Sequence, residues 1–107
     1  MIVSLLKYND DEIDAIDVEF DCLPPLGAEI HIDPADAPNK EEEVKCETFI
    51  RRCGGLCTGD FFIVEHILLH AWGGACLLVS LGDNPVRDLV KRDIDKINYS
   101  KMQLVKK

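Results

Sequence analysis

The sequence lacks the short motifs that identify many enzyme families. Its 107 residues contain no phosphate-binding P-loop, no dinucleotide-binding G-x-G-x-x-G and no nucleophile-elbow G-x-S-x-G. Each motif places a glycine-rich turn or an exposed serine beside a reacting group, so their absence argues against the enzymes that depend on them. No run approaches the roughly 18 apolar residues of a membrane-spanning helix. We therefore favour a protein that is neither an enzyme nor embedded in a membrane.

The sequence also lacks a recognisable secretory signal. Its first eight residues have no basic region, and their apolar run is too short for the core of a signal peptide. The five cysteines are an odd number without a secretory context, which indicates reduced thiols rather than a disulfide framework. We therefore expect a cytoplasmic protein.

Basic residues are scarce in the first half of the chain. Residues 1–47 hold 14 of the 20 acidic side chains but only 3 of the 12 basic ones, and the whole chain has a net charge of −8. An acidic surface repels the phosphates of DNA and RNA. Nucleic acid is therefore not an expected partner.

Residues 2–8 and 13–20 are predicted to form a first hairpin and residues 28–32 a third strand, because apolar residues alternate with mainly acidic ones over 13–20 and 28–32. Two longer apolar runs, residues 61–72 and 75–81, flank Gly73-Gly74, which is a typical two-residue hairpin turn. Residues 61–72 could instead form a buried helix, but their β-branched and aromatic residues favour a strand. The fold class predicted is mainly β (α+β), with a small antiparallel sheet or a partly open barrel.

The rest of the chain is predicted to surround this sheet within a single domain, residues 1–107. Residues 33–47 are acidic and proline-containing, which predicts a mobile loop, and residues 48–52 could form a short edge strand. Asn84 and Pro85 suit the start of an amphipathic C-terminal helix over residues 85–97, followed by a tail over 100–107. Either this helix or a dimer interface would explain why residues 61–72 are apolar on both faces.

The cysteines offer one candidate metal site. Cys53 and Cys57 have a C-x3-C spacing, and Cys46 and His66 could complete the four ligands that zinc requires. The second half of a zinc motif is missing, and buried, inert thiols are the more common outcome. The expectation is therefore no cofactor, with zinc or a thiol-dependent activity at these four residues as the alternative.

His66, His70 and Trp72 form a second group of candidates. On a strand the two histidines share one face, where they could contact a small ligand or a partner, although a half-buried pair is more common. The metalloprotease motif is absent because Ile67, not glutamate, follows His66. Trp72 would anchor a partner if it were exposed. We expect it to pack in the core instead.

Three segments resemble small SH3-like β-barrel domains of uncharacterised bacterial proteins. They are Leu23-Pro24-x-x-Gly27-x-x-Ile30, Phe62-x-Val64-x-x-Ile67-x-x-x-His70 and Leu77-x-Val79-x-Leu81, and the resemblance covers residues 13–81. It implies a barrel closed by the last two strands, and it implies no particular activity.

These observations predict a non-enzymatic interaction or accessory domain. The acidic sheet and a free strand edge near residues 48–52 could bind a protein partner by strand addition. The apolar central hairpin, residues 61–81, could also join two copies of the chain.

Overall fold

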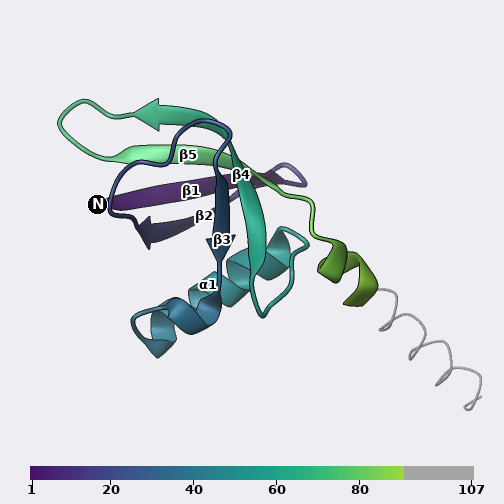
Figure 1. The fold of residues 1–107 in the computed structure, drawn as a ribbon. Helices are drawn as coiled ribbons and strands as arrows, with labels where there is room; N and C mark the ends of the chain where they lie inside the picture. The colour runs from purple at the N-terminus through teal and green to yellow at the C-terminus, as the bar shows by residue number, and fades with distance from the viewer. Residues whose placement is uncertain (91–107) are drawn as a thin grey trace, which may run out of the picture.

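The computed structural model describes residues 1–90, which form one curled sheet and an α-helix (Figure 1). The strand order is β2-β1-β5-β4-β3, and β1 and β5 run parallel while the other neighbours are antiparallel. The predicted mainly β fold is confirmed, but the sheet is mixed rather than purely antiparallel. The elements in chain order are β1 (Ile2–Asn9), β2 (Glu12–Glu19), β3 (Glu29–Ile32), the 3-10 helix η1 (Pro34–Asp36), α1 (Lys40–Arg52), β4 (Asp60–Leu69) and β5 (Ala75–Leu81).

The predicted N-terminal hairpin is confirmed. Asp10 and Asp11 connect β1 to β2 with φ angles of 46° and 68°. Positive φ at both central residues is characteristic of the type I′ turn, whose twist matches that of the two strands. The third predicted strand is confirmed as β3.

The central hairpin is also confirmed, so residues 61–72 do not form a helix. Its loop is longer than predicted, because five residues separate β4 from β5. The N–H of Gly73 donates to the carbonyl of His70 at 3.2 Å, and Trp72 has a φ of 66°. The loop therefore includes His70 and Trp72 and is not confined to the two glycines.

The predicted mobile loop at 33–47 and the edge strand at 48–52 are wrong, because η1 and α1 occupy this segment. The Asn39 side chain caps α1 by accepting a hydrogen bond from the N–H of Glu42 at 2.9 Å. Glu41, Glu42 and Glu43 lie in the first turn, where the partial positive charge of the helix end favours carboxylates. The acidic run that suggested disorder is therefore the start of a helix.

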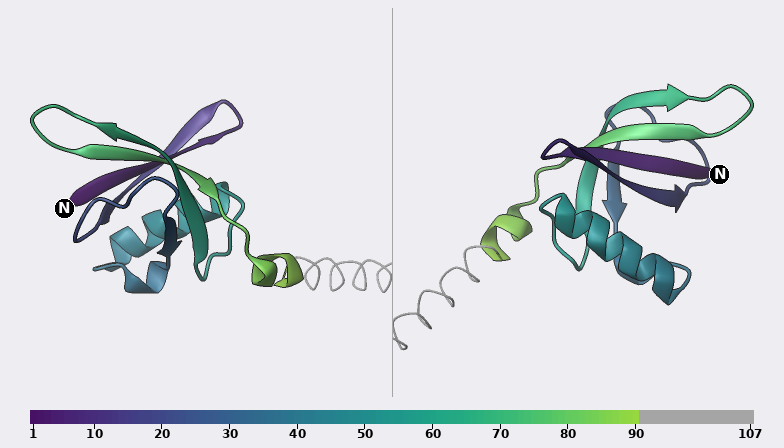
Figure 2. Two further views of the ribbon diagram at one scale, coloured as in Figure 1. Left: turned by 45° about the horizontal axis from the view of Figure 1, so that its top comes forward. Right: turned by 180° about the vertical axis from the view of Figure 1, so that it is seen from behind.

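α1 packs on one side of the curled sheet, which we call the inner face (Figure 2). Phe49 and Ile50 of α1 reach this face, where Phe49 lies 5.6 Å from the ring of Phe62. The buried core consists of Val3, Leu5, Ile16, Ile30, Ile32, Cys46, Phe49, Ile50, Phe62, Val64, Ala75, Leu77 and Val79.

The C-terminal helix begins where predicted, with residues 85–90 helical and Asn84 accepting from the N–H of Val86. Its expected cover over the sheet is not seen in this segment, since Val86 and Leu89 are 58% and 57% exposed. α1 covers the sheet instead. Residues 91–97 of the predicted helix, and the predicted tail at 100–107, lie outside the described residues. Among residues 1–90, no helix has the length and apolar character needed to cross a membrane.

Candidate functional site

The four candidate metal ligands are spread over the fold. Cys46 is buried in α1, Cys53 ends that helix, Cys57 is exposed in the following loop, and His66 is exposed on β4. In the described part of the chain, no three His, Cys, Asp or Glu side chains are close enough to hold a metal ion. The structure therefore does not bring Cys46, Cys53, Cys57 and His66 together as one ligand set.

Two of these thiols are held in their protonated form. Burial, with smaller contributions from Asp33 and Glu47, raises the pKa of Cys46 to about 11. Burial also raises the pKa of Cys53, although a hydrogen bond from Asn9 partly opposes it. Thiolates are the reactive and metal-binding form of cysteine. Neither residue is therefore poised for thiol chemistry at neutral pH.

A further candidate surface is the opposite side of the sheet, which we call the outer face. Leu78 lies at its centre, between Leu6 of β1 and His66 of β4, and is 42% exposed. No element within residues 1–90 covers this face. It is built from the outward side chains of β1, β4 and β5, which include Ser4, Leu6, Tyr8, Ile63, His66, Leu68, Cys76, Leu78 and Ser80.

A β-bulge determines which side chains of β4 reach the outer face. The register shifts between Val64 and His66, so Glu65 is an extra residue. Val64 points into the core, whereas His66 and Leu68 point outward, and Leu68 is 50% exposed. His66 and His70 both lie on the outer side as expected, since His66 pairs with Leu78 and the His70 ring contacts Cys76. A regular strand would also have placed Val64 there, but the bulge turns Val64 into the core.

The tip of the β4–β5 hairpin exposes further apolar side chains. Trp72 is 103% exposed, so the expectation that it packs in the core is wrong. Leu69 at the end of β4 is 67% exposed, and the His70 ring lies 3.3 Å from the Cys76 sulfur. A bulky side chain rarely adopts positive φ. The five-residue loop nevertheless holds Trp72 in that conformation, with its indole in solvent.

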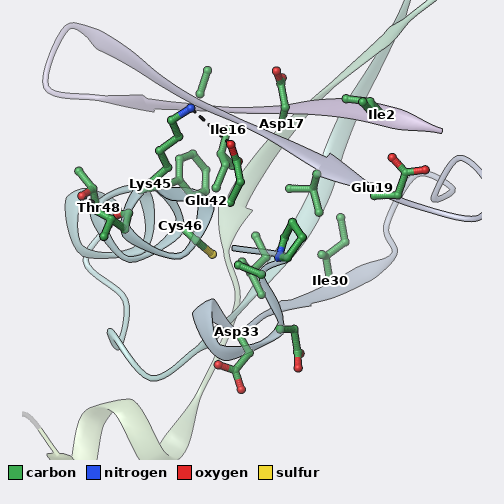
Figure 3. Close-up of a pocket in the computed structure, with 18 of the residues that line it drawn as sticks. Ile2, Ile16, Asp17, Glu19, Ile30, Asp33, Glu42, Lys45, Cys46 and Thr48 are labelled. Atoms are coloured by element: carbon green, nitrogen blue, oxygen red, sulfur yellow. Dashed lines mark hydrogen bonds and ion pairs between the residues drawn. The ribbon is translucent and has the colours of Figure 1, made fainter. Parts of the chain in front are cut away.

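A groove of about 1030 Å³ lies on the other side of the molecule, between β2, β3 and α1 (Figure 3). Ile16, Ile30 and Cys46 contribute to its apolar floor, and Asp17 and Glu19 lie along β2 at one rim. Sequence reasoning missed this groove because residues 33–52 were not recognised as helical. The signal that could have found it was the Asn39 cap followed by Cys46, Phe49 and Ile50 at helical spacing.

Sequence reasoning also missed a buried polar network at the start of β4. Asp60 is fully buried and accepts hydrogen bonds from the side chains of Asn84 and Arg87 at 3.1 and 3.0 Å, and from the N–H groups of Leu56 and Phe61. Burial alone would raise the pKa of Asp60, but these bonds outweigh it and hold the pKa below its usual value. The network attaches residues 84–87 to the sheet and is structural.

A scan against protein-family models, a search of curated proteins and a search of solved structures each returned no match for this chain. The candidate sites are therefore the two surfaces that the fold itself defines, the outer face and the groove.

Proposed function

We propose that this chain is a non-enzymatic interaction domain that self-associates through its outer face. One observation supports the proposal above all: the sheet is apolar on both sides, but α1 covers only the inner one. Exposed apolar patches of this kind mark interaction sites more often than chance exposure. Two carboxylates reach the outer face, where Asp17 and Glu65 accept hydrogen bonds from Ser4 and Ser80 at 2.6 and 2.5 Å. The outward side chains of β1 and β5 include no carboxylate, so two copies of a chain with net charge −8 can meet along these two strands.

The size of the outer face indicates a weak association. Three strands about 4.8 Å apart and about seven residues long cover roughly 14 by 23 Å in plane. A standard interface buries about 800 Å² per partner, so the face needs the hairpin tip to approach that size. Trp72 at the tip would then be the aromatic anchor, as large exposed aromatics are in many interfaces. We expect a dimer with a dissociation constant of about 10 μM.

Sedimentation velocity of the full chain over a range of concentrations tests the proposal. The wild-type protein should shift from monomer to dimer, and Leu78→Lys should remain a monomer because the substitution buries a charge at the centre of the interface. Leu26→Lys is the matched control, since Leu26 is 66% exposed and lies outside the outer face. A wild-type monomer at about 100 μM would contradict the proposal.

Trp72 provides an independent readout because it is the only tryptophan. Its emission should move to shorter wavelength as the wild-type protein is concentrated, and it should not move for Leu78→Lys. An unchanged spectrum alongside a dimer would place the hairpin tip outside the interface.

Two further proposals concern the class and location of the protein. The curled, partly open sheet supports the SH3-like resemblance, but α1 covers the inner face of that sheet and is an addition that the resemblance does not include. All five cysteines are unpaired, which supports a reducing, cytoplasmic location.

A further inference from the structure

The groove lies beside a free strand edge. β2 is the first strand in the sheet order, so only β1 pairs with it among the described elements. Met1 and Phe20 form two hydrogen bonds: the N–H of Phe20 donates to the carbonyl of Met1 at 2.8 Å, and the amino group of Met1 donates to the carbonyl of Phe20 at 2.9 Å. Since bonded pairs alternate along an antiparallel ladder, the backbone groups of Ala15, Asp17 and Glu19 point away from β1. This edge can therefore accept the hydrogen bonds of another strand.

The floor of the groove is apolar and partly open. Val18 of β2 and Phe20, which follows that strand, line the groove and are half-buried. Ile30 and Ile32 of β3 and Phe49 of α1 form its buried base. Side chains of an added strand alternate between two sides. One set would therefore contact this apolar floor.

The rim of the groove is acidic. Its lining includes six carboxylates but only two basic side chains, Lys45 and Arg52. Both are already engaged, Lys45 with Glu41 and Glu42, and Arg52 with glutamate and aspartate of β2. The six carboxylates are Asp14, Asp17, Glu19, Asp33, Asp36 and Glu42.

We propose that this groove binds an extended segment of another protein in which apolar residues alternate with lysine or arginine. The segment adds to the free edge of β2 as a sixth strand. Its apolar side chains enter the groove over Val18 and Phe20, and its basic side chains lie on the other side beside Asp17 and Glu19. Main-chain bonds provide the affinity, and the alternation provides the specificity.

The test uses the full chain and a fluorescent heptapeptide, acetyl-Lys-Val-Lys-Ile-Lys-Val-Lys-amide, in an anisotropy titration up to about 1 mM. The probe should bind, and its glutamate counterpart, acetyl-Glu-Val-Glu-Ile-Glu-Val-Glu-amide, should bind at least tenfold more weakly. Absence of binding, or equal binding of both peptides, would overturn the proposal.

Charge reversal locates the site. Asp17→Lys combined with Glu19→Lys should weaken binding of the lysine probe about tenfold or more. Asp83→Lys is the control, because Asp83 is exposed and does not line the groove. Circular dichroism verifies that each variant is folded. If the control weakens binding as much as the double variant, the attraction is that of the whole acidic chain and the groove is not the site.

N-methylation of the probe distinguishes strand addition from loose contact. In an extended strand, alternate N–H groups point to opposite sides, so only one set of residues can bond to β2. Methylating either the lysines or the apolar residues should abolish binding, while methylating the other set should leave it nearly unchanged. If the two methylated probes behave alike, the segment does not add to the edge of β2.

Discussion

Replacing Asp60 by asparagine should strongly destabilise the fold. The substitution keeps the shape of the side chain but removes its charge and half of its hydrogen-bond acceptors. Oδ2 accepts from the N–H of Leu56 at 3.0 Å, and Oδ1 accepts from Phe61, Asn84 and Arg87. Because an amide has only one oxygen, its NH₂ group must face at least one of these donors.

The expected loss in the free energy of unfolding follows from the burial of both Asp60 and Arg87. Asp60 is fully buried, and the side chain of Arg87 is 11% exposed. Leaving a buried charge without its partner costs about 3–5 kcal/mol, and an unsatisfied N–H costs about 1–3 kcal/mol, with the two effects overlapping at this site. The Nη2 bond from Arg87 to the carbonyl of Gly82 at 2.7 Å survives and reduces the loss. We expect Asp60→Asn to lower the free energy of unfolding by about 3 kcal/mol.

Urea denaturation followed by far-ultraviolet circular dichroism is the suitable assay. Trp72 is a poor reporter of unfolding, because its indole is exposed in the folded chain as well. Guanidinium chloride would screen the ion pair that the experiment is designed to measure. A loss below about 1 kcal/mol would show that Asp60 does not hold the network together.

The pH dependence gives a second check on Asp60. Its pKa is lower in the folded chain than in the unfolded chain, where it is about 3.9. Its contribution to stability is therefore complete above the unfolded pKa and is lost as pH falls through the folded one. The difference in unfolding free energy between wild type and Asp60→Asn should be constant near neutrality and shrink in acid. A difference that grows in acid would refute the argument.

Three further changes test the segment around α1. Gly55→Ala should cost about 1–3 kcal/mol in urea denaturation, because an added Cβ would lie 2.8 Å from Ile50 Cγ2 and 2.9 Å from a carboxylate oxygen of Asp60; an unchanged midpoint would contradict this. Asn39→Ala should cost about 1 kcal/mol through loss of the helix cap, with Asn39→Asp as a neutral control. Iodoacetamide should label Cys57 before unfolding and Cys46 only after it, because Cys46 is buried and has a raised pKa; mass spectrometry of the peptides would reveal the order.

The strands were predictable because their signals are local. Alternation along β2 and β3, and the glycines after Trp72, identify strands and turns from neighbouring residues alone. The parallel pairing of β1 with β5 was not predictable in this way, since it joins residues more than 70 positions apart. Local patterns also fixed the start of the C-terminal helix at Asn84 and Pro85.

α1 was missed although its end signals are present in the sequence. Asn39 precedes the acidic first turn, and Gly54 and Gly55 follow the last one. The N–H groups of Gly54 and Gly55 bond to the carbonyls of Arg51 and Ile50, at 3.0 and 2.9 Å, in a Schellman motif. Composition alone favoured a loop, because three consecutive glutamates and nearby prolines are common in disorder. Capping residues were the better guide in this segment.

The position of Trp72 shows where local reasoning ends. A two-residue turn at Gly73-Gly74 would have kept the tryptophan in the strand and directed it to one face of the sheet. The actual loop places it at the hairpin tip, because Leu69 pairs with Ala75 and the five residues between them form the loop. The exposure of Trp72 therefore depends on how two strands pair, which the glycine pair alone does not show.

The apolar character of β4 on both sides links the sequence to the proposed function. A strand with one solvated face normally alternates polar and apolar residues, and β4 departs from this pattern because Phe61, Ile63 and Leu68 point outward. α1 accounts for the inner side only. The expectation that the C-terminal helix would cover the other side is not met by residues 85–90. Self-association over the outer face would explain why β4 is apolar on its outward side as well. The sedimentation experiment tests this explanation.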